Sequence, residues 1–199
     1  GVEICEDGWV TIPPSDIHSL NGATIIANLS ASDELVTKAE YRRSMINAHS
    51  ARQFSIYMYS SAGFGESSKD VLYAGDTFIS ENGHLAAEGE RFLTTSQLIT
   101  ADVDISHVAF DRRCSHSWTG SATMFQRAYR LISTTVPSLP FEIKHDNSKI
   151  LRNITKQPFT SSNPTTLHAR CEEIIEIQAT ALAAKLKSVE HVIKRQVSI

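Results

Sequence analysis

The chain has 199 residues, enough for one domain or somewhat more than one. Hydrophobic residues make up 41% and charged residues 21%, which excludes the disordered, collagen-like and membrane-spanning classes. The formal net charge of −3 gives no basic excess for nucleic acid or an acidic membrane, so small metabolites are the expected partners.

Three cysteines, Cys5, Cys114 and Cys171, are an odd number at wide spacing, which favours reduced thiols over a disulfide framework. No apolar run approaches the roughly 18 residues of a membrane helix. Together these features indicate a cytoplasmic protein. Because the sequence opens on an apolar run without an initiating methionine, we expect it to be part of a longer protein.

The first quarter of the chain predicts alternating strands and helices. Residues 1–4 are typical of a strand, residues 5–9 of a turn and residues 15–20 of a short helix that ends at an Asn-Gly pair. Residues 23–29 are almost continuously apolar and rich in β-branched side chains, as in a strand covered on both faces. This pattern predicts a parallel sheet.

A longer helix is expected to follow, through about residue 52, with Ser32 or Asp33 as its N-cap. Residues 54–59 then predict a third strand, followed by a loop at 60–68. Two apolar runs joined by Asn82-Gly83 predict a hairpin over residues 78–88, because this pair tolerates the positive φ angles of a two-residue turn. A further strand is expected over 97–105.

The last part of the chain differs in composition. Residues 112–135 show no clear pattern, and four prolines between 137 and 164 indicate an extended connector. Apolar residues at spacings of three and four then predict a helix over 166–187, with Cys171 on its apolar face, and residues 189–199 could begin a strand. The chain therefore predicts an α/β fold divided into residues 1–150 and 151–199.

Cys5 is the first candidate for chemistry. It stands where a strand ends in a tight turn, a placement that exposes a nucleophile above a sheet edge. From position alone a buried structural thiol is the more common outcome. The surrounding residues decide between the two.

The run Gly-Val-Glu-Ile-Cys-Glu-Asp-Gly-Trp, followed by Pro13-Pro14, resembles the nucleophile segment of the nitrilase superfamily as found in glutamine-dependent NAD synthetases. Residues 28–32 with 38–43, and residues 59–67, resemble the next strand–helix and strand–loop blocks of that family. Residues 157–159 with 168–178 resemble the joint between its glutaminase and synthetase domains.

The resemblance implies a partial nitrilase-type α-β-β-α sandwich followed by a linker and a C-terminal helix. Residues 1–150 would be the C-terminal half of a glutaminase domain, and 151–199 the linker and first helix of a synthetase domain. The family's triad is a glutamate base, a lysine that stabilises the oxyanion and a cysteine that attacks the glutamine carboxamide. Cys5 would be that cysteine, while the glutamate and lysine would lie upstream of Gly1.

By the same resemblance, Glu6 and Trp9 would shape the glutamine pocket, and Ser32 and Lys38 would contact the polar end of the substrate. Each also has a purely structural interpretation. Glu6 could be a turn acid, Trp9 a core indole, Ser32 a helix cap and Lys38 a solvated helix lysine.

The family's substrates imply L-glutamine, deamido-NAD and ATP with magnesium as ligands of the complete enzyme, which would be a homo-oligomer, with no cofactor in this chain. Residues 194–199 depart from the family's Ser-Gly-Gly-x-Asp-Ser ATP loop. We expect no metal site, because Cys114 and His116 with His107 match no zinc spacing.

Two alternatives remain open on the sequence. A different nitrilase-type carbon–nitrogen hydrolase would share Cys5 and the strand order, but should not need the joint at 168–178. A non-catalytic remnant acting as an interaction module would explain a chain without the glutamate, the lysine and the ATP loop.

Overall fold

The computed structural model describes residues 1–67, 69–129, 132–133, 150–152, 154, 160 and 163–189. The chain divides into two compact units, Gly1–Arg152 and Asn153–Ile199. Assignment of the second unit to a synthetase domain stays a prediction. Among the described residues, no helix combines the length and apolar character that crossing a membrane requires.

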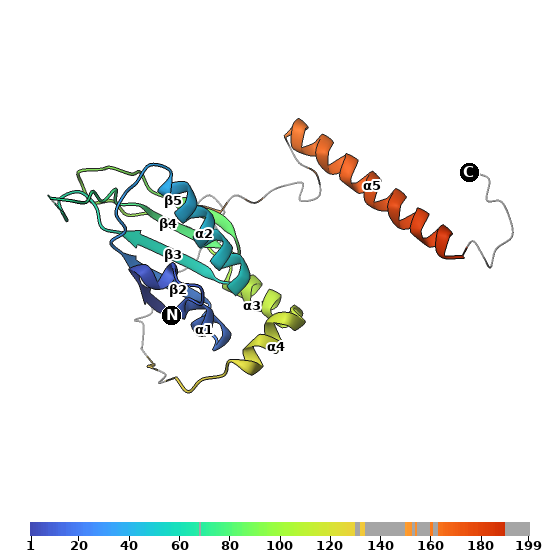
Figure 1. Ribbon diagram of the computed structural model, residues 1–199, viewed down its shortest axis with the longest axis horizontal. Helices are drawn as coiled ribbons and strands as arrows, with labels where there is room; N and C mark the ends of the chain where they lie inside the picture. Colours follow the sequence, from blue (N-terminus) through green and yellow to red (C-terminus); the bar gives the residue numbers. More distant parts are fainter. Residues whose placement is uncertain are drawn as a thin grey trace. The chain divides into compact units, whose positions relative to one another are not determined.

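The first unit is built on one five-stranded sheet, shown in Figure 1. Its strands, in spatial and chain order, are β1 (Val2–Ile4), β2 (Ile25–Ser30), β3 (Ile56–Ser61), β4 (Thr77–Glu81) and β5 (His84–Glu88). β1, β2 and β3 are parallel, whereas β4 and β5 are antiparallel to their predecessors. The predicted α/β fold and the predicted parallel sheet are confirmed.

Two helices cover one face of the sheet. α1 (Pro14–Leu20) packs on β1 and β2, and α2 (Lys38–Gln53) packs on β3 and β4 (Figure 1). Alternate strand residues point towards these helices, as a period of two requires. The hydrophobic core therefore lies between the helices and the sheet, and consists of Ile26, Ile46, Tyr57, Tyr59 and Phe78.

The opposite face carries apolar side chains that remain exposed. Strand register places Val2, Ala27, Met58 and Ile79 in one row across the sheet. Val2 is 59% exposed and Met58 39%, and Leu29 in the next row is 59% exposed. We name this row with Ile4 and Leu29 the open face. Its composition is that of a surface which packs against another layer.

The hairpin between β4 and β5 forms at the predicted residues. Asn82 and Gly83 have φ angles of 48° and 87°, both in the left-handed region. A Cβ on Gly83 would also lie 2.8 Å from the Cβ of Ala51, so the turn contacts α2 closely. The register shifts between Ile79 and Ser80, where Ala86 of β5 is passed over, so the edge strand contains a bulge.

The strand predicted over 97–105 is wrong. Residues 97–104 form no regular element, and Ile105 begins α3 (Ile105–Cys114). The side chain of Asp104 caps this helix by accepting a hydrogen bond from the N–H of His107 at 2.9 Å. Ser115 in turn caps α4 (His116–Met124), within the stretch that showed no clear sequence pattern.

The predicted start of the longer helix is also wrong. α2 begins at Lys38 after Thr37, which has a φ of 72°, and neither Ser32 nor Asp33 caps it. The backbone N–H of Glu34 instead donates to the carbonyl of Leu72 at 2.7 Å. This contact with a distant loop keeps residues 31–37 out of the helix.

The second unit contains α5 (Pro164–Val189), which confirms the predicted helix. Cys171 is exposed on α5 in this chain. That the apolar face of α5 shields it in the complete protein stays a prediction. Most of the expected connector, including Pro137, Pro140 and Pro158, and the expected strand at the C-terminus lie outside the described residues.

Arg112 anchors α3 to the first unit. Its guanidinium donates to the carbonyls of Phe54, Ala23 and Gln53 at 3.0, 2.7 and 3.1 Å, and to the hydroxyl of Ser19 at 3.2 Å. Burial lowers its pKa to about 10. One side chain thus provides hydrogen-bond donors for backbone carbonyls at the end of α2 and just before β2.

We expect Arg112→Met to lower the free energy of unfolding by about 2 to 3 kcal/mol, because it leaves buried carbonyls without donors. Urea denaturation followed by circular dichroism measures this. Arg113→Met is the matched control, since Arg113 is the exposed neighbour. Equal midpoints for the two variants would contradict the anchoring role.

We also expect the isolated chain to self-associate through the open face, because an exposed apolar surface of this kind is covered in stable proteins. Met58→Lys should shift the mass measured by light scattering towards the monomer. Val36→Lys, at an apolar residue that is 94% exposed away from the sheet, should leave the mass unchanged. A monomeric parent chain would refute this expectation.

Candidate active site

Cys5 follows β1 directly and opens a short 3₁₀ turn, η1 (Cys5–Gly8). Its φ is 51°, in the left-handed region that L-residues seldom occupy. The turn is closed at both ends: the N–H of Ile4 donates to Asp7 Oδ2 at 2.9 Å, and the N–H of Trp9 donates to the Glu6 carbonyl at 2.8 Å. The predicted strand and turn are therefore present, with Cys5 at the junction between them.

The thiol is partly buried in a depression at the carboxyl ends of the three parallel strands. The N–H of Ala31 points to Cys5 Sγ at 3.4 Å. Crevices beyond the carboxyl ends of parallel strands are common ligand sites in α/β sheets. Here the lining consists of Ile4, Cys5, Leu29, Ser30, Ala31, Ser60, Ser61 and Ala62.

The lining has one reactive group. Apart from Cys5, it contains apolar residues and serines, and it includes no carboxylate, lysine or histidine among the described residues. The Ala31 N–H can stabilise negative charge on sulfur, as backbone donors do at other sites. The depression thus holds a thiol with no adjacent base among the residues that the structure describes.

Beneath the turn lies a buried polar network. Glu3 is 2% exposed, and its carboxylate accepts hydrogen bonds from the N–H of Ser15 at 2.8 Å, from Asn28 Nδ2 at 3.3 Å and from the Tyr57 hydroxyl. Burial, together with the adjacent Glu3, raises the pKa of Tyr57 far above its ordinary value. The phenol therefore keeps its proton and donates a hydrogen bond to Glu3.

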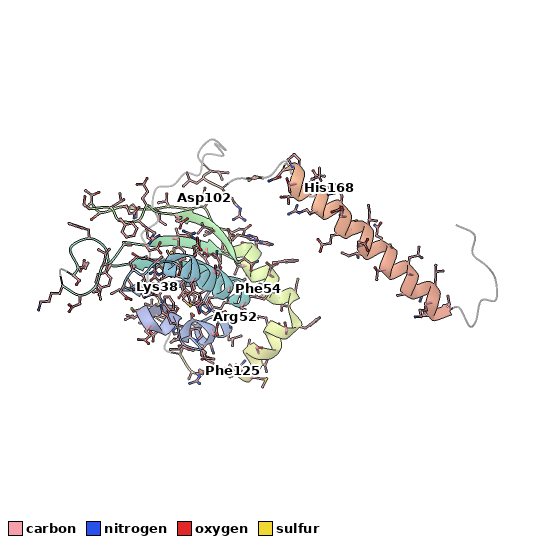
Figure 2. All side chains as sticks on the ribbon, turned by 45° about the horizontal axis from the view of Figure 1, so that its top comes forward. Lys38, Arg52, Phe54, Asp102, Phe125 and His168 are labelled. Carbon is pink, nitrogen blue, oxygen red and sulfur yellow. The ribbon has the colours of Figure 1, made fainter. Side chains whose placement is uncertain are left out.

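The structure brings Trp9 and Lys38 together. The ammonium of Lys38 lies 5.5 Å from the centroid of the Trp9 ring, and it pairs with Asp33 at 2.5 Å. The hydrogen bond and charge of Lys38 lower the pKa of Asp33. Trp9 also stacks on Tyr41, with ring centroids 5.8 Å apart. Figure 2 places Lys38 and Arg52 at opposite ends of α2.

Ser32 is buried in an ion cluster. Its hydroxyl accepts from Arg42 at 3.4 Å, and Arg42 pairs with Asp76 at 2.5 Å and Glu34 at 3.2 Å. Burial alone would lower the pKa of Arg42, but the bond to Asp76 and the nearby negative groups raise it. Ser32 is thus held by the protein's own cation.

Glu6 is exposed, and its side chain does not line the depression that holds Cys5. Trp9, Ser32 and Lys38 are likewise absent from that lining. The structure places these four residues on the turn after Cys5 and on the segment leading into α2. Their contact with a substrate stays a prediction.

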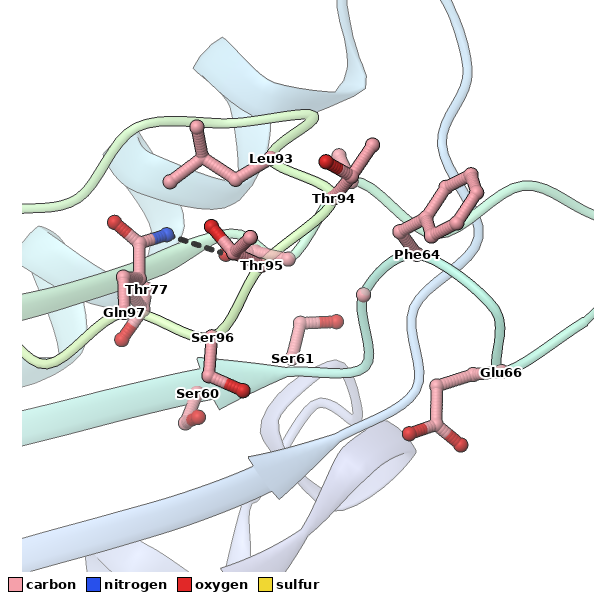
Figure 3. Close-up of a pocket in the computed structure, with 13 residues that line it drawn as sticks. Ser60, Ser61, Phe64, Glu66, Thr77, Leu93, Thr94, Thr95, Ser96 and Gln97 are labelled. Carbon is pink, nitrogen blue, oxygen red and sulfur yellow. Dashed lines mark hydrogen bonds between the residues drawn. The ribbon is translucent and has the colours of Figure 1, made fainter.

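A second hollow adjoins the depression and shares Ser60 and Ser61 with it. Figure 3 shows the 93–97 segment alongside the end of β3, where these serines lie. Gln97 holds the segment by donating to the carbonyls of Glu90 at 2.6 Å and Gly75 at 3.4 Å. Hydroxyl groups dominate this hollow, those of Ser60, Ser61, Thr77, Thr94, Thr95 and Ser96.

Sequence reasoning missed Glu3, Asn28, Tyr57 and Arg42. Glu3 and Asn28 interrupt otherwise apolar strand runs, which is the signal that could have identified them. Magnesium prefers carboxylate oxygens, but among the described residues no group of three or more His, Cys, Asp or Glu could hold a metal ion.

No protein-family model matches the chain. The glutamine-dependent NAD(+) synthetase of Mycobacterium leprae (strain TN) is 34% identical over 192 residues, which is 96% of this chain and 28% of that protein. The chain thus spans less than a third of the length of this relative, and the match includes α5.

Among solved structures, a glutamine-dependent NAD(+) synthetase from Cytophaga hutchinsonii is 30% identical, with a TM-score of 0.39 over 46% of this chain and 14% of that chain. A carbon-nitrogen hydrolase from Helicobacter pylori G27 is 17% identical, with a TM-score of 0.49 over 57% of this chain and 43% of that chain. With both TM-scores this low, the relationship rests on the sequence match. Over nearly all of its length, this chain is homologous to a segment of the glutamine-dependent NAD(+) synthetases.

Proposed function

We propose that this chain is the nucleophile-bearing segment of a longer glutamine-dependent NAD synthetase, and that Cys5 attacks glutamine. The observation that carries the proposal is the seat of Cys5, in a left-handed turn at the carboxyl ends of three parallel strands. The homology over 96% of the chain supports it. Because the match extends through α5, it favours the synthetase over a stand-alone carbon–nitrogen hydrolase.

The proposed reaction begins with the Cys5 thiolate attacking the carboxamide carbon of glutamine. The C–N bond then breaks, ammonia leaves with a proton from an acid, and a thioester remains on sulfur. Water hydrolyses the thioester to glutamate and restores the thiol. A thiol of ordinary pKa, about 8.5, is only a few per cent ionised at neutral pH, so the reaction needs a base.

The base and the oxyanion donor are assigned to residues outside this chain. The depression around Cys5 supports this, because its lining provides neither a carboxylate nor a lysine. Trp9 and Lys38 form one cluster. Glu6 and Trp9 are proposed to shape the glutamine pocket, and Ser32 and Lys38 to contact the polar end of glutamine. ATP, magnesium and deamido-NAD would bind elsewhere in the full-length protein, a cytoplasmic homo-oligomer.

We expect a glutamine-analogue electrophile to label Cys5 before Cys114 or Cys171 in the full-length protein. Cys114 and Cys171 are exposed in this chain, whereas Cys5 is partly buried, so exposure alone would favour the other two thiols. Peptide mass spectrometry at limiting reagent identifies the first site. Iodoacetamide is the control reagent, since it lacks the amino-acid group.

Preferential labelling of Cys114 or Cys171, combined with intact glutamine-dependent activity in Cys5→Ala, would refute the assignment of the nucleophile.

We further expect the isolated chain to release ammonia from glutamine no faster than its Cys5→Ala variant. Groups that act as a unit lose activity together, and loss of an oxyanion donor alone costs on the order of 10² to 10³ in rate. A coupled ammonia assay on both chains and the full-length protein measures this. Cys5-dependent turnover near the full-length rate would show that a base exists within these residues.

A further inference from the structure

The conformation of Cys5 requires support from its surroundings. A residue other than glycine in the left-handed region costs of order 1–3 kcal/mol, and persists where neighbouring contacts determine it. The bonds within the turn join Asp7 to Ile4, the last residue of β1, and Trp9 to Glu6, so they reach no neighbouring strand. The remaining support has to come from contacts outside the turn, which include the Ala31 N–H at Cys5 Sγ and the groups that lie beneath the turn.

Gly8 shows how closely the turn lies on the Glu3 network. A Cβ on this residue would meet Asn28 Nδ2 at 3.0 Å, the Tyr57 hydroxyl at 3.3 Å and Glu3 Oε1 at 3.5 Å. Only a glycine allows the backbone to approach all three groups without displacing one. The last residue of the turn is thus seated directly on the network.

The network also reaches the cysteine itself. Asn28 Nδ2 lies 3.5 Å from the carbonyl oxygen of Cys5, while also lying 3.1 Å from the Tyr57 hydroxyl. From the other side, His49 Nε2 donates to the carbonyl of Gly8 at 2.9 Å, and the His49 ring stacks on Tyr57. Asn28 of β2 therefore contacts the first residue of the turn and His49 of α2 holds the last, and Tyr57 of β3 contacts both of these side chains.

We propose that Glu3, Asn28 and Tyr57 are positioning residues for Cys5: their buried hydrogen bonds hold the η1 turn so that Sγ meets the substrate at the strand ends. This inference rests on the proposed function, since it assumes that Cys5 is the nucleophile. None of the three lines the depression, so they act through the backbone of the turn.

The primary test is Tyr57→Phe in the full-length protein, which removes one hydroxyl and no charge. We expect the kcat of glutamine hydrolysis to fall by about 10-fold or more with KM changed less than about twofold, because a small misplacement of a reacting group costs rate. Tyr73→Phe removes the same oxygen from a tyrosine outside the network and should leave both constants unchanged.

A substitution series at Glu3 provides the second test. Glu3→Gln keeps an oxygen acceptor for Asn28 and Tyr57, whereas Glu3→Ala keeps none, so kcat should decrease in the order parent, Glu3→Gln, Glu3→Ala. A residue needed only for folding would lower the yield of active protein, not the kcat per active site. Active sites are therefore counted by stoichiometric labelling of Cys5.

The rate of Cys5 alkylation by iodoacetamide across pH 6 to 10 provides a readout that needs no glutamine turnover. Tyr57→Phe should change the rate or the apparent pKa at Cys5 while leaving Cys114 and Cys171 unaffected. If Glu3→Gln does not fold, Tyr57→Phe decides alone. Unchanged kcat and alkylation in folded Tyr57→Phe would overturn the proposal, as would a change in KM alone.

A different result would refute the proposed function. Glutamine-dependent activity retained by Cys5→Ala would refute Cys5 as the nucleophile, whereas altered alkylation of Cys5 in Tyr57→Phe would still show that the network positions the turn.

Discussion

A buried carboxylate organises the part of the sheet on which the candidate site depends. Glu3 lies below the sheet edge with almost no exposure, and removing an ionised carboxylate from water costs several kcal/mol unless hydrogen bonds replace the lost hydration. Here the donors come from the first turn of α1, from β2 and from β3. Because each donor belongs to a different element, the charge is satisfied only when all three are in place.

A second buried charge, that of Arg42, joins the loops that follow β2 and β3. Arg42 extends from the first turns of α2 to Asp76, which precedes β4, and to Glu34, which precedes α2. Glu34 also pairs with Arg91 at 2.9 Å. The segments that follow β2 and β3 therefore meet around one cation. Both charged clusters lie near the carboxyl ends of the parallel strands, where Cys5 also lies.

Local chemistry explains which features of this fold could be predicted from the sequence. Apolar, β-branched runs and the Asn82-Gly83 pair correctly predicted strands and a hairpin, because each pattern acts within a few residues. The predictions failed where distant contacts decide the outcome. Residues 31–37 lie outside α2, and there the N–H of Glu34 bonds to the distant Leu72 carbonyl. Where a strand was predicted, the side chain of Gln97 bonds to the carbonyls of Gly75 and Glu90.

The candidate site divides in the same way. Cys5 became a candidate because strand, turn and thiol are adjacent in the sequence, and the resemblance of the surrounding residues to a known nucleophile segment favoured it; its role stays a prediction. Glu3, Tyr57 and Arg42 were missed because a polar residue in a strand or helix is equally compatible with a solvent-facing position. Which face the helices cover is a property of the assembled sheet, and one sequence without relatives does not contain that information in any local pattern.

The bulge at Ala86 has a consequence for how copies of this chain can meet. A sheet edge with unpaired backbone groups is a template for pairing with another chain, and proteins protect such edges with bulges, charged side chains and short strands. β5, at one lateral edge of the sheet, carries the bulge and has His84 and Glu88 at its two ends. Pairing of a second copy with the β5 edge of the sheet is therefore disfavoured.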